Sequence, residues 1–132
     1  MPDRSIHMIK LPSGDEIPPL ALGTRGMAEH PGRRDRELTA LRVGIDAGLS
    51  VIDTAGAYAG GRTEELVAEA VAGHRDEVFL VDRVLTGEPS RAGIAAGCHQ
   101  ALRRLGTDRL DLCLVDARAP TPLADAIDAL TA

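Results

Sequence analysis

Residues 51–66 read VIDTAGAYAGGRTEEL, and this stretch decides the fold. A short apolar run over 49–52 leads into Asp53 and then into a glycine-broken loop that carries Tyr58, the only tyrosine in the chain. Thr63 is placed to cap a helix with two acids in its first turn, where the helix dipole favours them. A strand that passes through a loop into a helix is typical of parallel α/β proteins, which keep their chemistry at the carboxyl ends of the strands.

The same alternation of strand and helix continues on both sides of this stretch. Upstream, residues 7–20 place a Ser-Gly-Asp turn between two short apolar pieces, a pattern that predicts a β-hairpin. Strands are predicted at 20–22, 49–52, 78–81 and 110–115, and helices near 34–47, after Thr63, after Ser90 and after Pro122. The last helix carries Ile127 and Leu130 at the spacing of a buried face. Short links between these elements indicate βαβ units and a parallel sheet covered by helices.

A hairpin followed by about four βα units predicts an α/β fold that is part of a (β/α)8 TIM barrel. A full barrel needs roughly 250 residues, and this chain has 132. We therefore expect residues 1–132 to form a single truncated half-barrel domain. Its first and last strands would leave open edges, and its inner face would be uncovered.

Composition excludes several classes of partner. The net charge is −5, and no basic stripe is available to neutralise phosphates, so nucleic acid is not an expected partner. Cys98 and Cys113 fall in segments predicted to pack, which favours free thiols and a cytoplasmic location. No apolar run approaches the roughly 20 residues of a membrane span, and the N-terminus lacks an apolar signal core. No metal site is predicted.

Residues that follow successive strands of a barrel converge on one rim. That rim would collect Gly23 and Thr24, then Asp53 and Tyr58, then Arg83, and finally Asp116. A phenol beside a fixed cation releases its proton more readily because the cation favours the phenolate. Tyr58 would therefore suit a general acid that protonates a carbonyl oxygen, with Asp53 holding the cation. The competing interpretation is structural, with Asp53 capping the loop and Tyr58 packing.

Four runs of the sequence point to a known family. They are IPPLALGTRGMAE at 17–29, ALRVGIDAGLSVIDTAGAYAGGRTEELVAEAVAG at 40–73, DEVFLVDRV at 76–84 and ALRRLGTDRLDLCLVDA at 101–117. The most specific segments are IDTAGAY at 52–58 and LRRLGTDRLDL at 102–112. In order and spacing, essentially the whole chain resembles the N-terminal half of a bacterial aldo-keto reductase.

The resemblance implies an oxidoreductase that uses NADPH to reduce small aldehydes and ketones on a (β/α)8 barrel. The family's catalytic set is Asp, Tyr, Lys and His, and Asp53 and Tyr58 match the first two. Arg83 stands where the family has its lysine, and Asp116 stands where it has its histidine. Arg83 keeps the positive charge and could pair with Asp53. An ionised Asp116 can only accept hydrogen bonds, would repel a developing oxyanion and would capture Arg83 instead.

The resemblance also implies where the cofactor would lie. Gly23 and Thr24 match a loop near the nicotinamide end of NADPH, and Arg25 replaces the aromatic residue usual in that loop. Phosphate in this fold is usually held by loops after the seventh and eighth strands, which this chain does not contain. We expect impaired reduction by the chain alone. The alternative is a non-catalytic half-barrel, a pseudoenzyme or truncated fragment, that pairs its open edges as a homodimer or with a C-terminal half.

Overall fold

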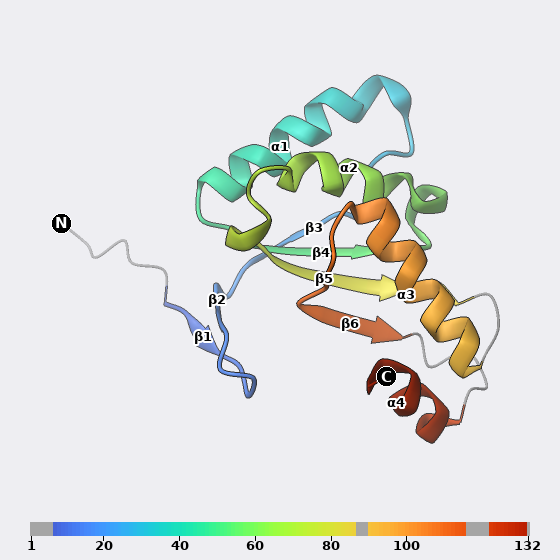
Figure 1. Cartoon of the computed structure of the whole chain (residues 1–132). Helices are drawn as coiled ribbons and strands as arrows, with labels where there is room; N and C mark the ends of the chain where they lie inside the picture. The colour runs from blue at the N-terminus through green and yellow to red at the C-terminus, as the bar shows by residue number, and fades with distance from the viewer. Residues whose placement is uncertain (1–6, 87–89, 116–121, 132) are drawn as a thin grey trace.

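A parallel sheet of four strands forms the centre of the protein (Figure 1). The strands lie in sequence order: β3 (Ala21–Gly23), β4 (Val51–Ala55), β5 (Phe79–Val84) and β6 (Leu112–Val115). The structure is a computed structural model that describes residues 7–86, 90–115 and 122–131. The strand order confirms the predicted chain of βα units.

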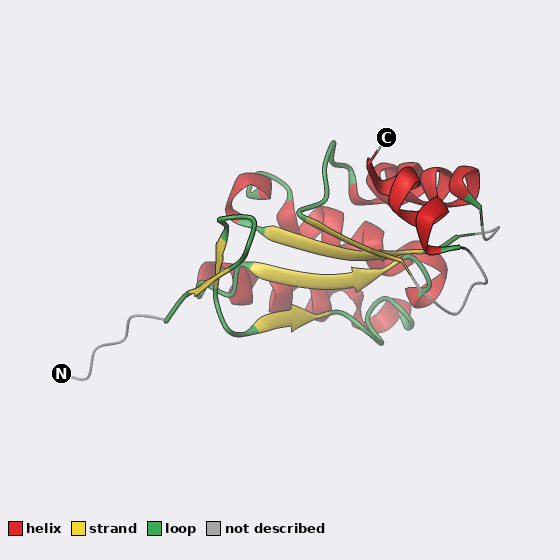
Figure 2. Ribbon diagram, turned by 90° about the horizontal axis from the view of Figure 1, so that it is seen from below, coloured by secondary structure: helices red, strands yellow, loops and turns green. Residues whose placement is uncertain are grey.

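Three helices connect the strands and cover one face of the sheet (Figure 2). They are α1 (Arg34–Asp46), α2 (Arg62–Val71) and α3 (Arg91–Leu105), and α4 (Leu123–Thr131) follows β6. Short 3-10 turns precede α1, α2 and β5, at η1 (Pro31–Arg33), η2 (Tyr58–Gly61) and η3 (Arg75–Glu77). The predicted cap of α3 is confirmed, because Ser90 Oγ accepts a hydrogen bond of 3.0 Å from the Gly93 N–H. Gly106 ends that helix in the left-handed conformation, at φ 60°.

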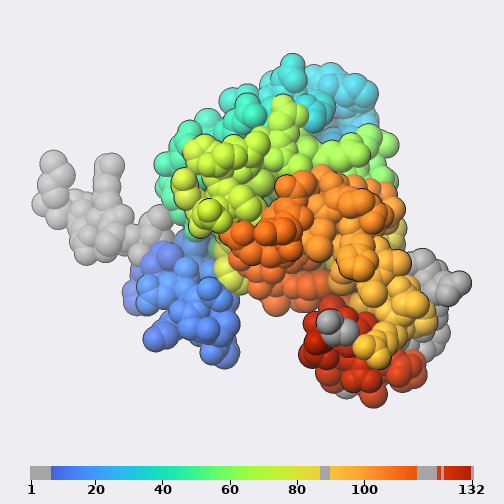
Figure 3. Space-filling view, viewed as in Figure 1, coloured from blue at the N-terminus to red at the C-terminus, as the bar shows by residue number. Residues whose placement is uncertain are grey.

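The predicted hairpin is present ahead of the sheet. Strands β1 (Ile9–Lys10) and β2 (Glu16–Ile17) pair antiparallel. The turn is closed by the Leu11 N–H, which donates to the Asp15 carbonyl at 2.8 Å, and Gly14 adopts a φ of 95° within it. Figure 3 shows the hairpin projecting from the body of the molecule, away from α4. It therefore lies near the end of the sheet where the strands begin.

The core lies between the sheet and the helices and is aliphatic, as the scarcity of aromatic residues predicts. Its largest fully buried apolar side chains include Leu41, Ile52, Leu66, Leu80 and Leu105. Each such side chain contributes about 1.5–3 kcal/mol by leaving water. The βα units are thus held together on the helix side of the sheet.

The opposite, inner face of the sheet is only partly covered. Among the described residues β3 and β6 each pair with one strand, which confirms the expected open edges. Leu112 on β6 is 44% exposed. The expectation that α4 buries its apolar face is wrong, because Ile127 is 52% and Leu130 44% exposed. Helical spacing makes an apolar stripe but does not supply the element that covers it, and α3, which α4 contacts, leaves much of this stripe exposed.

Two details of the predicted elements differ from the structure. The strands predicted at 49–52 and 78–81 continue to Ala55 and Val84, because the backbone ladder runs on through polar residues that break the apolar pattern. Thr63 is not the cap of α2. Gly61 holds that position at φ 92°, and the Thr63 hydroxyl instead donates to the Met27 carbonyl at 2.8 Å.

Gly97 in α3 is predicted to be intolerant of any side chain. A Cβ there would lie 2.6 Å from the backbone carbonyl oxygen of Leu85, which cannot move without shifting the chain after β5. We expect Gly97→Ala to lower the free energy of unfolding by about 2 kcal/mol, although Gly→Ala within a helix ordinarily stabilises by about 0.5–1 kcal/mol. Urea denaturation measures the change.

Gly44→Ala in α1 is the matched control. Its Cβ would lie 2.8 Å from the two Cδ atoms of Leu22, and a leucine tip can rotate away. We expect Gly44→Ala to stay within about 1 kcal/mol of the parent. A Gly97→Ala protein as stable as Gly44→Ala would show that the chain after β5 yields easily.

Candidate active site

Asp53 and Arg83 lie on the inner face of the sheet, each half-buried. The register of β4 and β5 pairs Asp53 with Val81 and Ala55 with Arg83. The two side chains therefore leave the same face two residues apart, about 7 Å along the strand direction. They do not form an ion pair in the described part of the chain, so the pairing of Arg83 with Asp53 that the sequence allowed is not observed. The register, which a single strand cannot reveal, places the two residues diagonally across the strand pair and not directly opposite each other.

Tyr58 is positioned by a run of left-handed residues. Ala59, Gly60 and Gly61 have φ values of 49°, 66° and 92°. This run turns the chain sharply between β4 and α2. A left-handed alanine costs roughly 1–2 kcal/mol, so the rest of the fold must hold the turn. The half-buried phenol is thereby fixed beside the ends of the strands.

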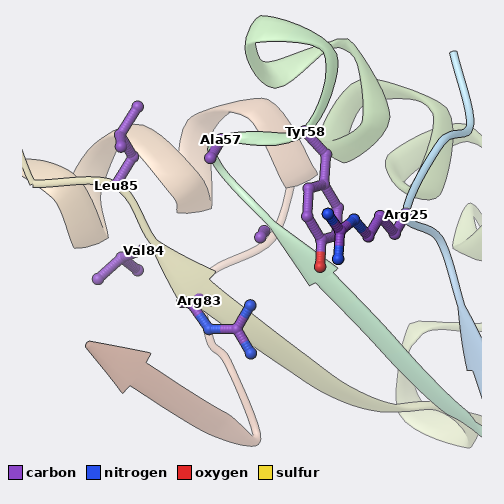
Figure 4. A pocket seen from close by; sticks show the side chains of 7 residues that line it. Arg25, Ala57, Tyr58, Arg83, Val84 and Leu85 are labelled. Carbon is purple, nitrogen blue, oxygen red and sulfur yellow. The ribbon is translucent and has the colours of Figure 1, made fainter. Parts of the chain in front are cut away.

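Tyr58 and Arg83 share a pocket of about 360 Å³ at this end of the sheet. Its lining is Arg25, Ala55, Ala57, Tyr58, Arg83, Val84 and Leu85. Figure 4 shows the phenol and the two guanidinium groups directed into the same space from three different segments. Among these described lining residues there are two cations and no acid. Arg25 was not predicted as a site residue, although the sequence offered two signals for it. It lies between two glycines after the first strand, and it replaces the aromatic residue usual in that loop.

Gly23 and Thr24, the predicted cofactor residues, lie at the end of β3. Thr24 is fully buried, and both its N–H and its hydroxyl donate to the Asp53 carbonyl, at 3.1 and 2.9 Å. Thr24 thus ties the first loop to the strand that carries Asp53. Gly23 is exposed, and a Cβ added to it would meet no atom within 4 Å. The backbone at Gly23 is therefore open to the approach of a ligand.

Asp116, the remaining predicted site residue, lies outside the described residues. Within 7–86, 90–115 and 122–131, no group of three or more His, Cys, Asp or Glu side chains is arranged to hold a metal ion. Over the same ranges, none of the helices combines the length and apolarity that crossing a membrane requires.

A second polar cluster lies on the helix side of the sheet, where the sequence predicted only core. Asp82 on β5 and Glu64 on α2 are both fully buried. Arg104 on α3 donates to Glu64 at 3.0 Å. Its guanidinium passes so close to Gly61 that a Cβ there would lie 2.4 Å from Cζ. Glycine at that position is what lets Arg104 reach the buried acid.

Several polar atoms of this cluster lack hydrogen-bond partners among the described residues. Both carboxylate oxygens of Asp82, one of Glu64 and the Thr54 hydroxyl are buried and have no hydrogen-bond partner in the described part of the chain. Burial, reinforced by the charges of Glu64 and Asp53, raises the pKa of Asp82 to about 7. Burial also raises the pKa of Glu64, against the opposing effect of Arg104. Asp82 is therefore the side chain here whose charge changes near neutral pH.

Stability is expected to fall as pH rises because of Asp82. Its folded pKa of about 7 lies above the ordinary value of 3.8, so unfolding between these values releases a proton. The stability that this proton confers is fully present below about pH 4 and is lost as pH rises through about 7. Asp82→Asn should remove this decline and be more stable than the parent at pH 8. Urea denaturation from pH 5 to 8 measures the effect; parallel profiles for the two proteins would contradict it.

The two cysteines are free thiols, as predicted. Cys98 on α3 and Cys113 on β6 are half-buried, and their Sγ atoms lie 3.9 Å apart. Burial, reinforced by Cys98, raises the pKa of the Cys113 thiol to about 12. The thiolate is the reactive form of cysteine, so Cys113 is a packing residue at neutral pH.

Known proteins are similar to this chain in sequence. The methylglyoxal reductase YeaE of Escherichia coli (strain K12) is 44% identical over 104 residues, which are 78% of this chain and 37% of that protein. Aldo-keto reductase AKR2E4 of Bombyx mori is 35% identical over 133 aligned residues, covering 92% of this chain and 42% of the relative. The chain thus spans about 40% of the length of these relatives.

The fold of the chain also matches solved structures of aldo-keto reductases. The aldo/keto reductase of Klebsiella pneumoniae, in complex with NADP and acetate, has a TM-score of 0.88 at 41% identity. The match covers 94% of this chain and 44% of that one, so the fold is about half of a (β/α)8 barrel. The sequence profile of the Aldo/keto reductase family matches residues 19–132. This profile, the sequence relatives and the shared βα order show that the chain belongs to the aldo/keto reductase family.

Proposed function

We propose that this chain carries the proton-donating part of the active site of an NADPH-dependent oxidoreductase for small aldehydes and ketones. The observation that carries the proposal is that the Tyr58 phenol and the Arg83 guanidinium share one pocket at the carboxyl ends of the strands. Active sites of barrels are built at this end. Family membership and the NADP-bound relatives support the choice of cofactor.

The residues present suit a proton transfer. Tyr58 would hold the proton and pass it to the carbonyl oxygen, while Arg83 stabilises the phenolate left behind. Asp53 lies on the same face of the sheet as Arg83, and its negative charge would help to orient the Arg83 guanidinium and the Tyr58 phenol. NADPH, when bound, supplies the hydride. The open backbone at Gly23 leaves room for it, and Thr24 holds Gly23 beside Asp53.

Activity of the 132-residue chain alone is proposed to be low. Phosphate in (β/α)8 barrels is usually bound by loops after strands seven and eight. The matched part covers 37% of one relative and 44% of another, and the four strands of the described sheet do not include a seventh or eighth strand. The free thiols support a cytoplasmic setting for the protein.

A non-catalytic role is the second candidate, favoured by the open edges. Among the described residues β3 and β6 each lack a second neighbour, and Leu112, Ile127 and Leu130 expose apolar surface. Exposed strand edges pair readily with other strands. A second copy, or a separate C-terminal half, would complete the sheet. Light scattering tests self-association: a dimer supports pairing of copies, and a well-folded monomer contradicts it.

NADPH fluorescence and methylglyoxal turnover test the proposed reduction. Methylglyoxal is chosen because a relative is a methylglyoxal reductase. We expect saturable NADPH binding and slow turnover that disappears in Tyr58→Phe, with NADPH affinity retained. Absence of binding at millimolar NADPH would reject reduction by this chain, and turnover that survives Tyr58→Phe would reject Tyr58 as the acid.

A further inference from the structure

The described lining of the pocket beside Tyr58 carries an excess of positive charge. Arg25 and Arg83 both line it, while its remaining walls are apolar apart from Tyr58. Within the described part of the chain neither arginine forms an ion pair or a side-chain hydrogen bond. By contrast, Arg34, Arg75 and Arg104 are each paired with an acid. Two guanidinium groups directed into one pocket repel each other unless an anion lies between them.

Both cations depart from the family pattern that the sequence resembles. In the resemblance drawn above, the position of Arg25 is usually aromatic and that of Arg83 is usually lysine. The two substitutions come from separate segments, the loop after β3 and the strand β5, and meet only in the folded protein. A guanidinium offers a planar fork of donors that matches a carboxylate, which neither an aromatic ring nor an ammonium does.

We propose that this pocket binds a short-chain 2-oxo acid, with Arg25 and Arg83 holding its carboxylate. The adjacent carbonyl oxygen then lies toward the Tyr58 hydroxyl, which shares the pocket. Ala55, Ala57 and Val84 provide apolar walls for a short alkyl group. The volume of about 360 Å³ is at the small end of ligand pockets. It suits a molecule of a few heavy atoms and is too small for a dinucleotide.

The chemical consequence rests on the proposed function. With NADPH as reductant, C2 of the 2-oxo acid gains a hydride and its carbonyl oxygen takes the Tyr58 proton. The C=O π bond is replaced by one C–H and one O–H bond. The products are a 2-hydroxy acid and NADP⁺, and Tyr58 is reprotonated from solvent. Carboxylate binding itself needs neither NADPH nor turnover.

Titration followed by ¹⁵N NMR, without cofactor, tests the site. The ligands are pyruvate, its neutral amide pyruvamide, acetate and inorganic phosphate. We expect pyruvate to shift the amide signals of the Tyr58 loop and to bind at least about tenfold more tightly than pyruvamide. Equal binding of pyruvate and pyruvamide would overturn the proposal. Tighter binding of phosphate than of pyruvate would also overturn it, because the site would then be one for phosphate.

Variants that replace an arginine with neutral glutamine test which residues bind the carboxylate. Arg25→Gln and Arg83→Gln are each expected to weaken pyruvate binding about tenfold. Arg36→Gln on the outer side of α1 removes the same charge from an exposed position and should leave binding unchanged. Equal losses in all three variants would indicate a general charge effect and overturn the site. Circular dichroism checks that each variant is folded, and Arg83→Lys provides a second, conservative variant at the strand position.

The outcome for binding is separable from the outcome for reduction. Pyruvate binding that depends on Arg25 and Arg83, together with no NADPH binding, supports the anion site and rejects the reductase. Methylglyoxal turnover with no binding of pyruvate supports the reductase and rejects the anion site. Pyruvate turnover that falls at least about tenfold more than methylglyoxal turnover in Arg25→Gln supports both.

Discussion

Replacing Arg104 with leucine is expected to lower the free energy of unfolding by about 3–5 kcal/mol. Arg104 is the described partner of Glu64, whose side chain is fully buried, and the ion pair is 3.0 Å long. Removing one member of a buried pair leaves the other charge without compensation. Asp82 is also fully buried and has no hydrogen-bond partner among the described residues, so the loss of Arg104 would leave two buried acids without a paired cation. Urea denaturation at pH 8 measures the loss.

Arg34→Leu is the matched control for this change. Arg34 also pairs with a glutamate, Glu69, but both side chains are more than 40% exposed. Exposed pairs contribute at most about 1 kcal/mol. The loss in Arg104→Leu should also shrink at pH 5, because burial raises the pKa of Glu64 and a protonated carboxyl tolerates the apolar setting better. Equal losses for the two variants at pH 8 would show that Glu64 is not held by Arg104.

Replacing Asp116 with histidine is expected to raise the rate of methylglyoxal reduction about 100- to 1000-fold, the range associated with one donor to a developing oxyanion. The expectation rests on the resemblance, in which Asp116 takes the position of the family's histidine. An ionised aspartate accepts hydrogen bonds only, whereas histidine donates one to the carbonyl oxygen as charge develops there. The kcat of parent and variant, measured at saturating NADPH, gives the change.

Two further variants separate the effect of adding a hydrogen-bond donor from the effect of removing the negative charge. Asp116→Ala removes the negative charge without adding a donor, so its gain should be much smaller than that of Asp116→His. Adding Tyr58→Phe to Asp116→His should abolish the gain, because the proton then has no source in the pocket. A rate unchanged by Asp116→His would contradict the proposed role of this position and favour the non-catalytic half-barrel.

Several features of the protein follow from the sequence because they depend on neighbouring residues. The turn at 13–15, the Ser90 cap and the glycine that ends α3 are local choices of backbone conformation and hydrogen bonding. The alternation of apolar runs with helical stripes predicts the βα order and hence one rim for strand-end residues. Asp53 and Tyr58 could be singled out in this way.

The tertiary structure decided the features that depend on residues far apart in the chain. The register of β4 and β5 separates Asp53 from Arg83, and the packing of the loops brings Arg25 to Arg83 instead. Strand alternation turns Asp82 toward the helices, where it meets Glu64 and Arg104. Apolar spacing and helix propensity are properties of a segment, whereas burial and charge environment depend on which segments pack together. The sequence therefore determined where chemistry could occur, and only the fold determined which charges share the pocket.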